Sequence, residues 1–381
     1  MDDVSQNPTS SLNGGSTNGV ATAYADRAAA VATHGDSTDL TATHSRTANS
    51  SSSSSSSPTP PVADLAIVVV STNEARWLTA CLSTVFAHAG DATLDVVVVD
   101  NESSDGTREL VESGFPAARV VASANRGFGH GNNRGVETTS ARYVLLLNPD
   151  TEIVAGTFGE LVSMLDERPE VGLVGVRQLT PDGTLFPTIR RFPSAARALG
   201  EALASERWPV SPAWAGERVL DMDLYECECE ADWTSGSFML ARREALLSAG
   251  CLDERFFIYA EEPDLCLRMK RAGWGVRHLP DMTIVHHACK GGVRPRMIAQ
   301  DAFARRQYAH KHFSRAHRSL YLGAIGARHA IRAVVASVKG DEAAINREAA
   351  RRAIATLAGR AEPPFGPPPP TALAPLARRS F

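Results

Sequence analysis

The stretch that decides the fold is LLLNPDTE, residues 145–152, in which an apolar run ends abruptly in Asn-Pro-Asp. The run begins at Tyr143 and has the length and composition of a strand that is buried on both faces, as parallel strands are. Pro149 has no N–H to donate and holds the chain extended, so the strand ends there. Asn148 and Asp150 then present polar oxygen atoms at the edge where open α/β sheets bind ligands. The stretch therefore predicts a ligand site at a strand end.

Outward from this strand, residues 62–313 alternate apolar runs with helical patterns, which predicts βαβ units and a mostly parallel sheet flanked by helices. Each predicted strand of the first half is followed by polar residues, and the carboxyl ends of parallel strands meet at one edge. We therefore expect these residues to converge on a site, although turn formation and helix capping are the alternative use of such side chains. They are Ser71, Thr72, Asn73 and Glu74; Asp100 and Asn101; Asn125 and Arg126; and Asn148 and Asp150.

The glycine-rich stretch NRGFGHGNNRG, residues 125–135, invites comparison with a dinucleotide-binding fingerprint. Its glycine spacing is not G-x-G-x-x-G, and it does not follow the first strand, which argues against a Rossmann dehydrogenase. Glycines beside Arg126 still predict close approach of the backbone to a phosphate or a sugar.

The second half of the chain contains a cluster of acidic residues at the start of a predicted helix. The segment DERFFIYAEEPDLCLRMKRAGW, residues 253–274, predicts a helix with Glu261, Glu262 and Asp264 in its first turn. Carboxylates at this position also interact well with the helix dipole, so a structural cap is the alternative. Clustered carboxylates repel one another and raise the pKa of at least one of them, which favours a general base near neutral pH.

A late alternating segment, PDMTIVHHACKGG at residues 280–292, predicts a strand that ends at His286 and His287. Mg²⁺ and Mn²⁺ accept carboxylate and phosphate oxygen, and Mn²⁺ in particular also accepts imidazole. The sequence therefore suggests that one of the two histidines joins Asp150 on a divalent cation.

Composition bounds the class of protein. The chain has 381 residues, and its net charge of −4 argues against a general nucleic-acid binder. We interpret its six cysteines as reduced thiols of a cytosolic protein. Residues 1–61, rich in Ser and Thr, are expected to be disordered, and they lack the pattern of a secretory signal. No apolar run reaches the roughly 18 residues that a membrane-spanning helix needs.

Residues 314–381 predict a basic helical extension that ends in a Pro-rich tail. In SLYLGAIGARHAIRAVVASVKG, residues 319–340, apolar side chains are interleaved with Arg328, Arg332 and Lys339. Two interpretations remain open: a helix that packs on the main domain, and a basic amphipathic helix that lies on an anionic membrane surface.

Taken together, these stretches resemble the family-2 glycosyltransferases of GT-A fold, and within them the bacterial rhamnosyltransferase-like branch that builds cell-wall and surface polysaccharides. The resemblance runs from about Leu65 to Gly292 and includes VVVDNESSDGT, LLLNPDTE, WTSGSFMLARREAL and the acidic helix start, in the order of the family. It implies a tail at 1–61, a GT-A domain with a Rossmann-like, mostly parallel sheet at 62–313, and the helical extension at 314–381.

The resemblance also implies roles for single residues. The nucleotide pocket would comprise Ser71, Asn73, Glu74, Asp100, Asn101, Arg126 and Asn148, with Asp100 bonded to the pyrimidine. Asn148-Pro149-Asp150 stands where the family has Asp-x-Asp, so Asp150, with His286, would hold Mg²⁺ or Mn²⁺. The family's base is the Asp of a Glu-Asp pair, and this chain has Glu261-Glu262, so Glu262 inherits the role with Asp264 in reserve. Trp233, Ser235 and Gly236 would line the donor sugar or the acceptor.

The implied reaction is inverting transfer of a sugar from a nucleotide-diphospho-sugar, with dTDP-rhamnose expected as the donor and UDP-sugars next. The acceptor would be a glycan or a lipid-linked sugar, and the protein would be cytoplasmic, with a peripheral contact to the inner face of the membrane. The alternative from another class is a non-catalytic sugar-nucleotide-binding or scaffold protein on the same fold.

Overall fold

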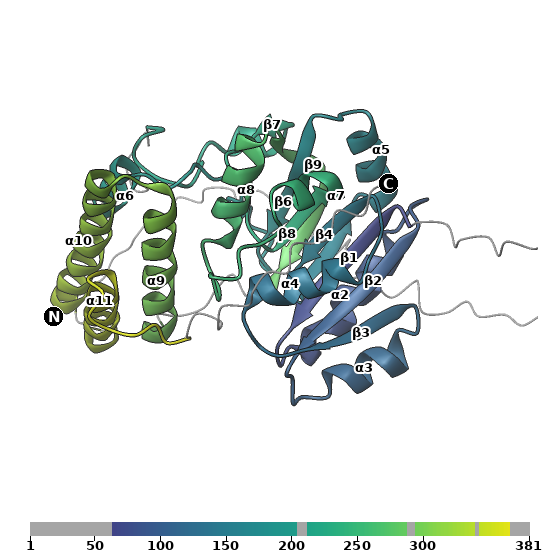
Figure 1. Ribbon diagram of the computed structural model, residues 1–381, viewed down its shortest axis with the longest axis horizontal. Coiled ribbons are helices and arrows are strands. Elements are labelled where there is room, and N and C mark those ends of the chain that lie inside the picture. Colours follow the sequence, from purple (N-terminus) through teal and green to yellow (C-terminus); the bar gives the residue numbers. More distant parts are fainter. Residues whose placement is uncertain (1–62, 204–211, 288–293, 340–342, 366–381) are drawn as a thin grey trace, which may run out of the picture. The chain divides into compact units, whose positions relative to one another are not determined.

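The apolar runs of the sequence form the strands of one mixed sheet in the computed structural model, which describes residues 63–203, 212–287, 294–339 and 343–365 (Figure 1). All of these residues belong to one unit, residues 61–381; the predicted N-terminal tail lies outside the described residues. The strand order is β3-β2-β1-β4-β8-β6-β9-β5, with β7 paired to β9. The strands are β1 Leu65–Ser71, β2 Leu94–Asn101, β3 Ala118–Ser123, β4 Tyr143–Leu147, β5 Thr151–Ala155, β6 Val171–Leu179, β7 Cys229–Glu230, β8 Phe238–Arg242 and β9 Gly275–His286.

The helices alternate with the strands of the first half, as predicted. In chain order they are α2 Ala75–Ala87, α3 Thr107–Gly114, α4 Phe128–Glu137, α5 Phe158–Asp166, α6 Ala195–Ala202, α7 Arg243–Ser248, α8 Glu261–Arg271, α9 Pro295–His312, α10 Arg315–Lys339 and α11 Ala343–Leu357, with a short 3₁₀ turn at Met222–Tyr225.

The sheet has a parallel core and a mixed second half. Strands β3, β2, β1 and β4 are parallel, which confirms the predicted core and brings their carboxyl ends to one edge. Strand β8 runs antiparallel to β4 and β6, and β5 runs antiparallel to β9. The β5–β9 pairing sets Thr151 opposite His286, so the residue after Asp150 is in register with the predicted metal ligand.

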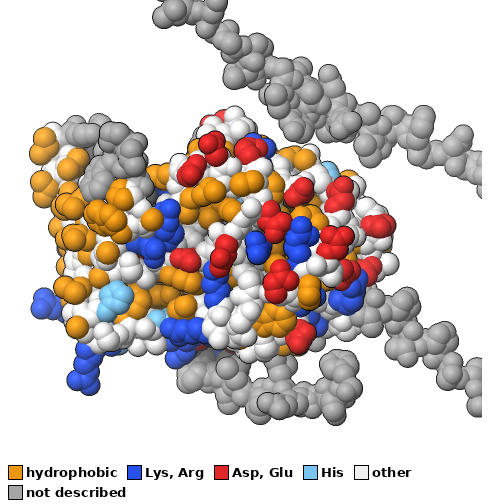
Figure 2. Space-filling view, turned by 90° about the horizontal axis from the view of Figure 1, so that it is seen from above, with side chains coloured by type: hydrophobic (Ala, Val, Ile, Leu, Met, Phe, Trp, Pro, Cys, Tyr) orange, Lys and Arg blue, Asp and Glu red, His pale blue; other side chains and the backbone are white. Residues whose placement is uncertain are grey.

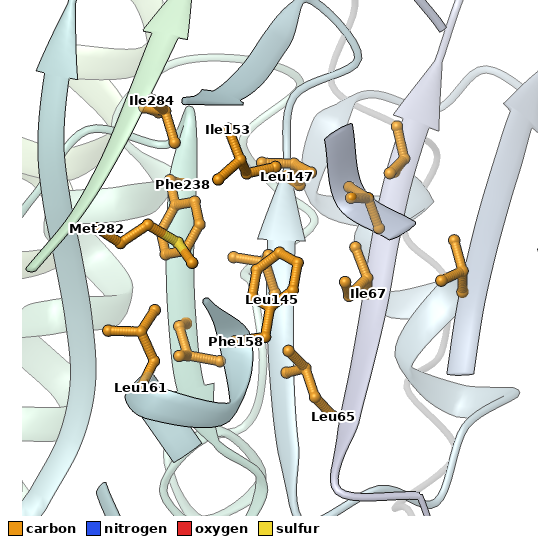
Figure 3. Close-up of a cluster of buried hydrophobic side chains, with 14 of the residues drawn as sticks. Leu65, Ile67, Leu145, Leu147, Ile153, Phe158, Leu161, Phe238, Met282 and Ile284 are labelled. Carbon is orange, nitrogen blue, oxygen red and sulfur yellow. The ribbon is translucent and has the colours of Figure 1, made fainter. Parts of the chain in front are cut away.

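Two hydrophobic clusters cover the two faces of the sheet, because successive side chains of a strand point to opposite sides. One cluster joins Leu65, Ile67 and Leu145 to Phe158 and Leu161 of α5 (Figure 3). The other joins the intervening residues of β1, β2 and β4 to α4, α7 and α8. A sheet buried on both faces exposes little besides its edges and strand ends, which leaves the carboxyl ends as the place for a site.

The glycine-rich stretch forms helix α4, and Gly127, which precedes the helix, lines a cavity at the strand ends, so the predicted approach of this backbone to a phosphate or a sugar stays a prediction. A Cβ at Gly131 would lie 2.7 Å from Val70 Cγ1, and one at Gly135 would lie 2.3 Å from Val68 Cγ1. These glycines therefore let the helix pack closely on strand β1.

Helices α9, α10 and α11 pack on one another, and α10 also packs on α6 (Figure 1). Their shared core contains the buried side chains of Tyr321 and Ile325, so α10 has a packed face. Another face of α10 exposes Leu320, Val334 and Val338. Among the described residues, no helix combines the length and hydropathy required to cross a bilayer, and all five cysteines are free thiols.

Candidate active site

A cavity of about 380 Å³ opens at the carboxyl ends of the parallel strands. This is the edge at which the sequence predicted a ligand site. Residues from four strand ends and from distant parts of the chain line it: Val70, Thr72, Glu74, Asn101, Asn125, Gly127, Phe128, Asn148, Pro149, Asp150, Phe257, Ile258, Met297 and Phe365.

The end of β1 contributes every second residue to the cavity. Val70, Thr72 and Glu74 line it; β1 ends at Ser71, and Asn73, with a φ of 57°, turns the chain towards α2. Ser71 and Asn73 are not among the residues that line the cavity, and their predicted contacts with the nucleotide stay predictions. The side chain of Ser71 is fully buried, and Asn73 Oδ1 accepts a hydrogen bond of 2.8 Å from the N–H of Ser104.

The ends of β2 and β3 show the same division between lining and bracing residues. Asn101 lines the cavity, and its buried Oδ1 has no hydrogen-bond partner among the described residues. Asp100 Oδ1 accepts a hydrogen bond of 2.9 Å from the N–H of Ser103, which braces the following loop. After β3 the cavity is lined by Asn125, whereas the predicted Arg126 does not line it.

Asp150 and His286, which are far apart in the sequence, meet at the cavity. His286 Nε2 lies 3.1 Å from Asp150 Oδ1 and 3.4 Å from Asn148 Nδ2. On the other side of the ring, Gln178 Nε2 lies 3.1 Å from His286 Nδ1, which fixes the orientation of the imidazole.

This pair fits a divalent cation that also binds a diphosphate. Two ligand atoms at right angles and about 2.1 Å from a cation are about 3 Å apart, close to the Asp150–His286 separation of 3.1 Å. Among the described residues, no group of three or more His, Cys, Asp or Glu side chains gathers as a metal site. Of the residues that the structure describes, Asp150 and His286 are thus the carboxylate and the imidazole that would hold such a cation.

Glu74 stands near Asp150 at the same rim. Burial, followed by the negative charge of Asp150, raises the pKa of Glu74. A cation or a hydrogen-bond donor placed in the cavity would reduce this repulsion, which is consistent with a ligand site.

Glu261 and Glu262 begin α8, where the sequence placed an acidic cluster. Burial, followed by the charge of Glu262, raises the pKa of Glu261 well above its ordinary value, and burial raises the pKa of Glu262. Glu261 is 2% exposed, whereas Glu262 is only partly buried and reachable from solvent. A raised carboxyl pKa, as predicted, is thus present at both glutamates, and Glu262 is the more accessible of the two.

Asp264 occupies a different environment, which favours a structural role over that of a reserve base. Its carboxylate is fully buried and lies 2.8 Å from Arg268, 2.6 Å from Lys311 and 2.7 Å from the His312 Nε2 atom. Burial alone would raise its pKa, but the hydrogen bond from His312 and the charges of Arg268 and Lys311 lower it. Asp264 therefore anchors α9 to α8.

The turn Ser235-Gly236-Ser237 lies between the acidic helix and the Asp150 strand end. A Cβ at Gly236 would lie 2.6 Å from Glu262 Oε1, so only glycine lets the carboxylate approach this closely. On the other side, the N–H of Asn148 donates to the carbonyl of Ser237 at 3.1 Å. Ser237 Oγ donates to Gln178 Oε1 at 2.6 Å, and Ser235 Oγ lies 3.2 Å from Ser237 Oγ. The turn thus connects Glu262 to the residues that hold His286.

Several lining residues were missed at the sequence level. Phe257 and Ile258 lie within the quoted acidic segment but carry no polar signal. Met297 and Phe365 come from α9 and from beyond α11, and only tertiary packing brings them to the cavity.

Comparisons with known proteins agree with this geometry. The family model described as glycosyl transferase family 2 matches residues 66–227. The chain is 31% identical over 214 residues to N-acetylglucosaminyl-diphospho-decaprenol L-rhamnosyltransferase of Mycobacterium tuberculosis, a match that covers 52% of this chain and 68% of that protein. It is 24% identical over 236 residues to rhamnosyltransferase WbbL of Escherichia coli K12, which covers 58% and 83% of the two chains.

Among solved structures, GalNAc-T7 with UDP, GalNAc and Mn²⁺ superimposes with a TM-score of 0.51 at 12% identity, over 77% of this chain and 55% of that chain. At this identity the likeness concerns the fold alone. The sequence relatives, together with the strand-end cavity and the parallel core, lead to one conclusion. The chain belongs to glycosyl transferase family 2, as a rhamnosyltransferase-like glycosyltransferase of GT-A fold.

Proposed function

We propose that the protein transfers a sugar, with inversion at the anomeric carbon, from a nucleotide-diphospho-sugar to a hydroxyl group of a glycan or lipid-linked acceptor in cell-surface glycan synthesis. The observation that carries this proposal is the turn at residues 235–237. It approaches Glu262 on one side and bonds to Asn148 and Gln178 on the other. A base and a diphosphate site on two sides of one rigid turn suit a direct displacement at a carbon atom between them.

Glu262 is the proposed base. A carboxyl group whose pKa is raised by burial is a stronger proton acceptor near neutral pH than an ordinary one. It would take the proton of the acceptor hydroxyl as that oxygen attacks the anomeric carbon. A protein that only binds sugar nucleotides has no use for a carboxyl group with a raised pKa at Glu262, which disfavours the non-catalytic alternative.

The donor nucleotide would lie in the cavity against Glu74, Asn101 and Asn148, with Asp100 beside it at the end of β2. The unpartnered Oδ1 of Asn101 is suited to accept a hydrogen bond from a pyrimidine N–H. The two rhamnosyltransferase relatives favour dTDP-rhamnose as the donor, with UDP-sugars as the next candidates. The donor sugar or the acceptor would extend towards Trp233, Ser235 and Gly236.

Asp150 and His286 would hold Mg²⁺ or Mn²⁺ against the diphosphate. A divalent cation there offsets the charge that develops on the leaving diphosphate. Calorimetric titration with dTDP-rhamnose, UDP-galactose, UDP-N-acetylglucosamine and GDP-mannose, with and without Mg²⁺ or Mn²⁺, tests both proposals. We expect metal-dependent binding of one donor, and we expect Glu262→Gln to keep that affinity while transfer is abolished. Retained transfer would remove Glu262 from its role, and binding of no donor would contradict the donor site.

We also propose a cytoplasmic location with a peripheral contact between α10 and an anionic membrane surface. Figure 2 shows hydrophobic side chains gathered at the left of the view, where α10 and α11 lie. The exposed hydrophobic side chains of α10 include Leu320, Val334 and Val338, which are 67%, 64% and 83% exposed. The helix contains no acidic residue and carries Arg315, Arg318 and Arg332, besides Arg328, which pairs with Glu201. Apolar residues bordered by cations suit the interface of an anionic bilayer.

The division into a tail at 1–61, a GT-A domain at 62–313 and an extension at 314–381 remains part of this proposal. Because α10 buries Tyr321 and Ile325 among the neighbouring helices, a deletion beyond Ser314 would also remove part of a packed core. Point substitutions on the exposed face of α10 are therefore the better test of the membrane contact.

A further inference from the structure

We propose that Arg190 forms a binding subsite for a phosphate group that the acceptor carries next to the sugar that is glycosylated. This inference rests on the proposed function, since it assigns part of the acceptor to a group beside the proposed base. It deepens that function because it assigns recognition of the acceptor to one residue outside the donor cavity, Arg190.

The backbone fixes Arg190 beside the turn that approaches Glu262. The N–H of Arg190 donates to the carbonyl of Trp233 at 3.0 Å, and the N–H of Trp233 donates back at 3.3 Å. Trp233 leads directly into the turn at residues 235–237. The positive charge of Arg190 acts to lower the pKa of Glu262, so the two groups lie within electrostatic reach of each other.

The guanidinium group is held by aromatic rings. Its central carbon lies 5.9 Å from the ring centroid of Phe186 and 5.7 Å from that of Trp233. Ring faces attract cations but supply no hydrogen-bond acceptor in the plane of the guanidinium group. The rings therefore position the group and leave its N–H donors available.

Within the part of the chain that the structure describes, the guanidinium of Arg190 forms no ion pair and no hydrogen bond, and its Nε atom is buried without a partner. Besides Glu262, two further carboxylates lie near Arg190 and are engaged by other arginines: Glu217 lies 2.8 Å from Arg305, and Glu201 pairs with Arg328. Burial, followed by the charge of Arg218, lowers the pKa of Arg190. A partly buried cation of this kind is unfavourable unless an anion binds to it.

The chemistry of the group identifies that anion. A planar guanidinium binds phosphate through two parallel hydrogen bonds, which makes arginine the usual residue for such recognition. The donor diphosphate belongs at Asp150 and His286 in the cavity, which Arg190 does not line. A ligand that reaches both Glu262 and Arg190 must carry a hydroxyl group and a phosphate group, as a sugar linked to a phosphate or diphosphate does. The Mycobacterium tuberculosis relative is named for N-acetylglucosaminyl-diphospho-decaprenol, a sugar linked to a diphosphate, which supports the assignment.

The test compares two acceptor probes on the full chain by calorimetry and by steady-state kinetics. One probe is N-acetylglucosaminyl diphosphate carrying a short isoprenyl chain, and the other is the methyl glycoside of the same sugar. For Arg190→Gln we expect affinity for the diphosphate probe to fall about 10- to 100-fold, while affinity for the methyl glycoside and for the donor stays unchanged. Arg190→Lys should restore part of the affinity for the diphosphate probe, because lysine keeps the positive charge but cannot form the two parallel hydrogen bonds of a guanidinium group.

Arg191→Gln is the matched control, because Arg191 is the neighbouring cation and its Nη1 donates to the carbonyl of Arg218, at 3.3 Å. Equal losses for both probes, or a loss of donor affinity, would overturn the subsite. Failure of the wild-type protein to prefer the diphosphate probe would overturn it as well. If the wild-type protein prefers that probe but transfers no sugar from any donor, the proposed function fails and the subsite stands.

Discussion

Replacement of Asp264 by Asn separates the structural acid of α8 from its proposed catalytic neighbour. The Asp264 carboxylate is fully buried and lies within 2.8 Å of Arg268, 2.6 Å of Lys311 and 2.7 Å of His312. Removing one partner from a buried ion pair leaves the other charge uncompensated and typically lowers the free energy of unfolding by roughly 3–5 kcal/mol. We expect a loss of that size for Asp264→Asn, measured by urea unfolding at pH 7.

Glu262→Gln is the matched control in the same turn of helix. Its carboxyl is desolvated without a paired cation, as its raised pKa indicates, so a neutral amide of the same shape removes an unfavourable burial. We expect the free energy of unfolding to change by less than about 1 kcal/mol, or to rise, while transfer is abolished.

The pH dependence provides a second readout for Asp264. Its folded pKa is lowered, so its contribution to stability is complete above the ordinary Asp pKa of about 3.9 and is lost as the pH falls through the lower folded value. The difference in stability between wild type and Asp264→Asn should therefore shrink in that acidic window. An Asp264→Asn protein with wild-type stability and no transfer would refute this reasoning and make Asp264 the base.

Three further predictions concern packing, proton transfer and the membrane. Gly135→Ala places a Cβ 2.3 Å from Val68 Cγ1 and should lower the free energy of unfolding by roughly 1–3 kcal/mol in urea titrations, with part of the loss recovered in the double variant with Val68→Ala; a double variant that recovers nothing would exclude this contact as the cause. Because burial raises the pKa of Glu262 above 4.5 and only the ionised form accepts a proton, the turnover rate should rise with pH along a limb centred above pH 4.5, and a limb centred at or below that pH would contradict the assignment. The double variant Leu320→Glu, Val338→Glu should reduce co-sedimentation with anionic vesicles roughly tenfold or more at unchanged donor affinity, and unchanged co-sedimentation would remove the proposed membrane contact; Ser319→Glu, which adds a charge outside the apolar stripe, is the control.

The sequence by itself determined the strands, the edge that carries the site and the family. Apolar runs such as the one from Tyr143 to Leu147 are long enough to mark buried strands, and residues 148–150 mark a strand end without any tertiary information. The acidic cluster at Glu261 and Glu262 was likewise visible in the sequence, because two like charges in one helix turn repel each other in any environment.

Tertiary structure alone decided which residues face the cavity and what the others do. Thr72 lines it and Ser71 does not, because the direction of a strand side chain depends on which face packs against a helix. The glycines of α4 serve packing against β1, and Asp264 is neutralised by cations from α9, contacts that no local pattern reveals. Arg190 and Glu262 are distant in sequence and come together through the pairing of Arg190 with Trp233. Local sequence sets which conformation a segment favours, whereas the partner of a charge or a buried face is set by the chain that folds against it.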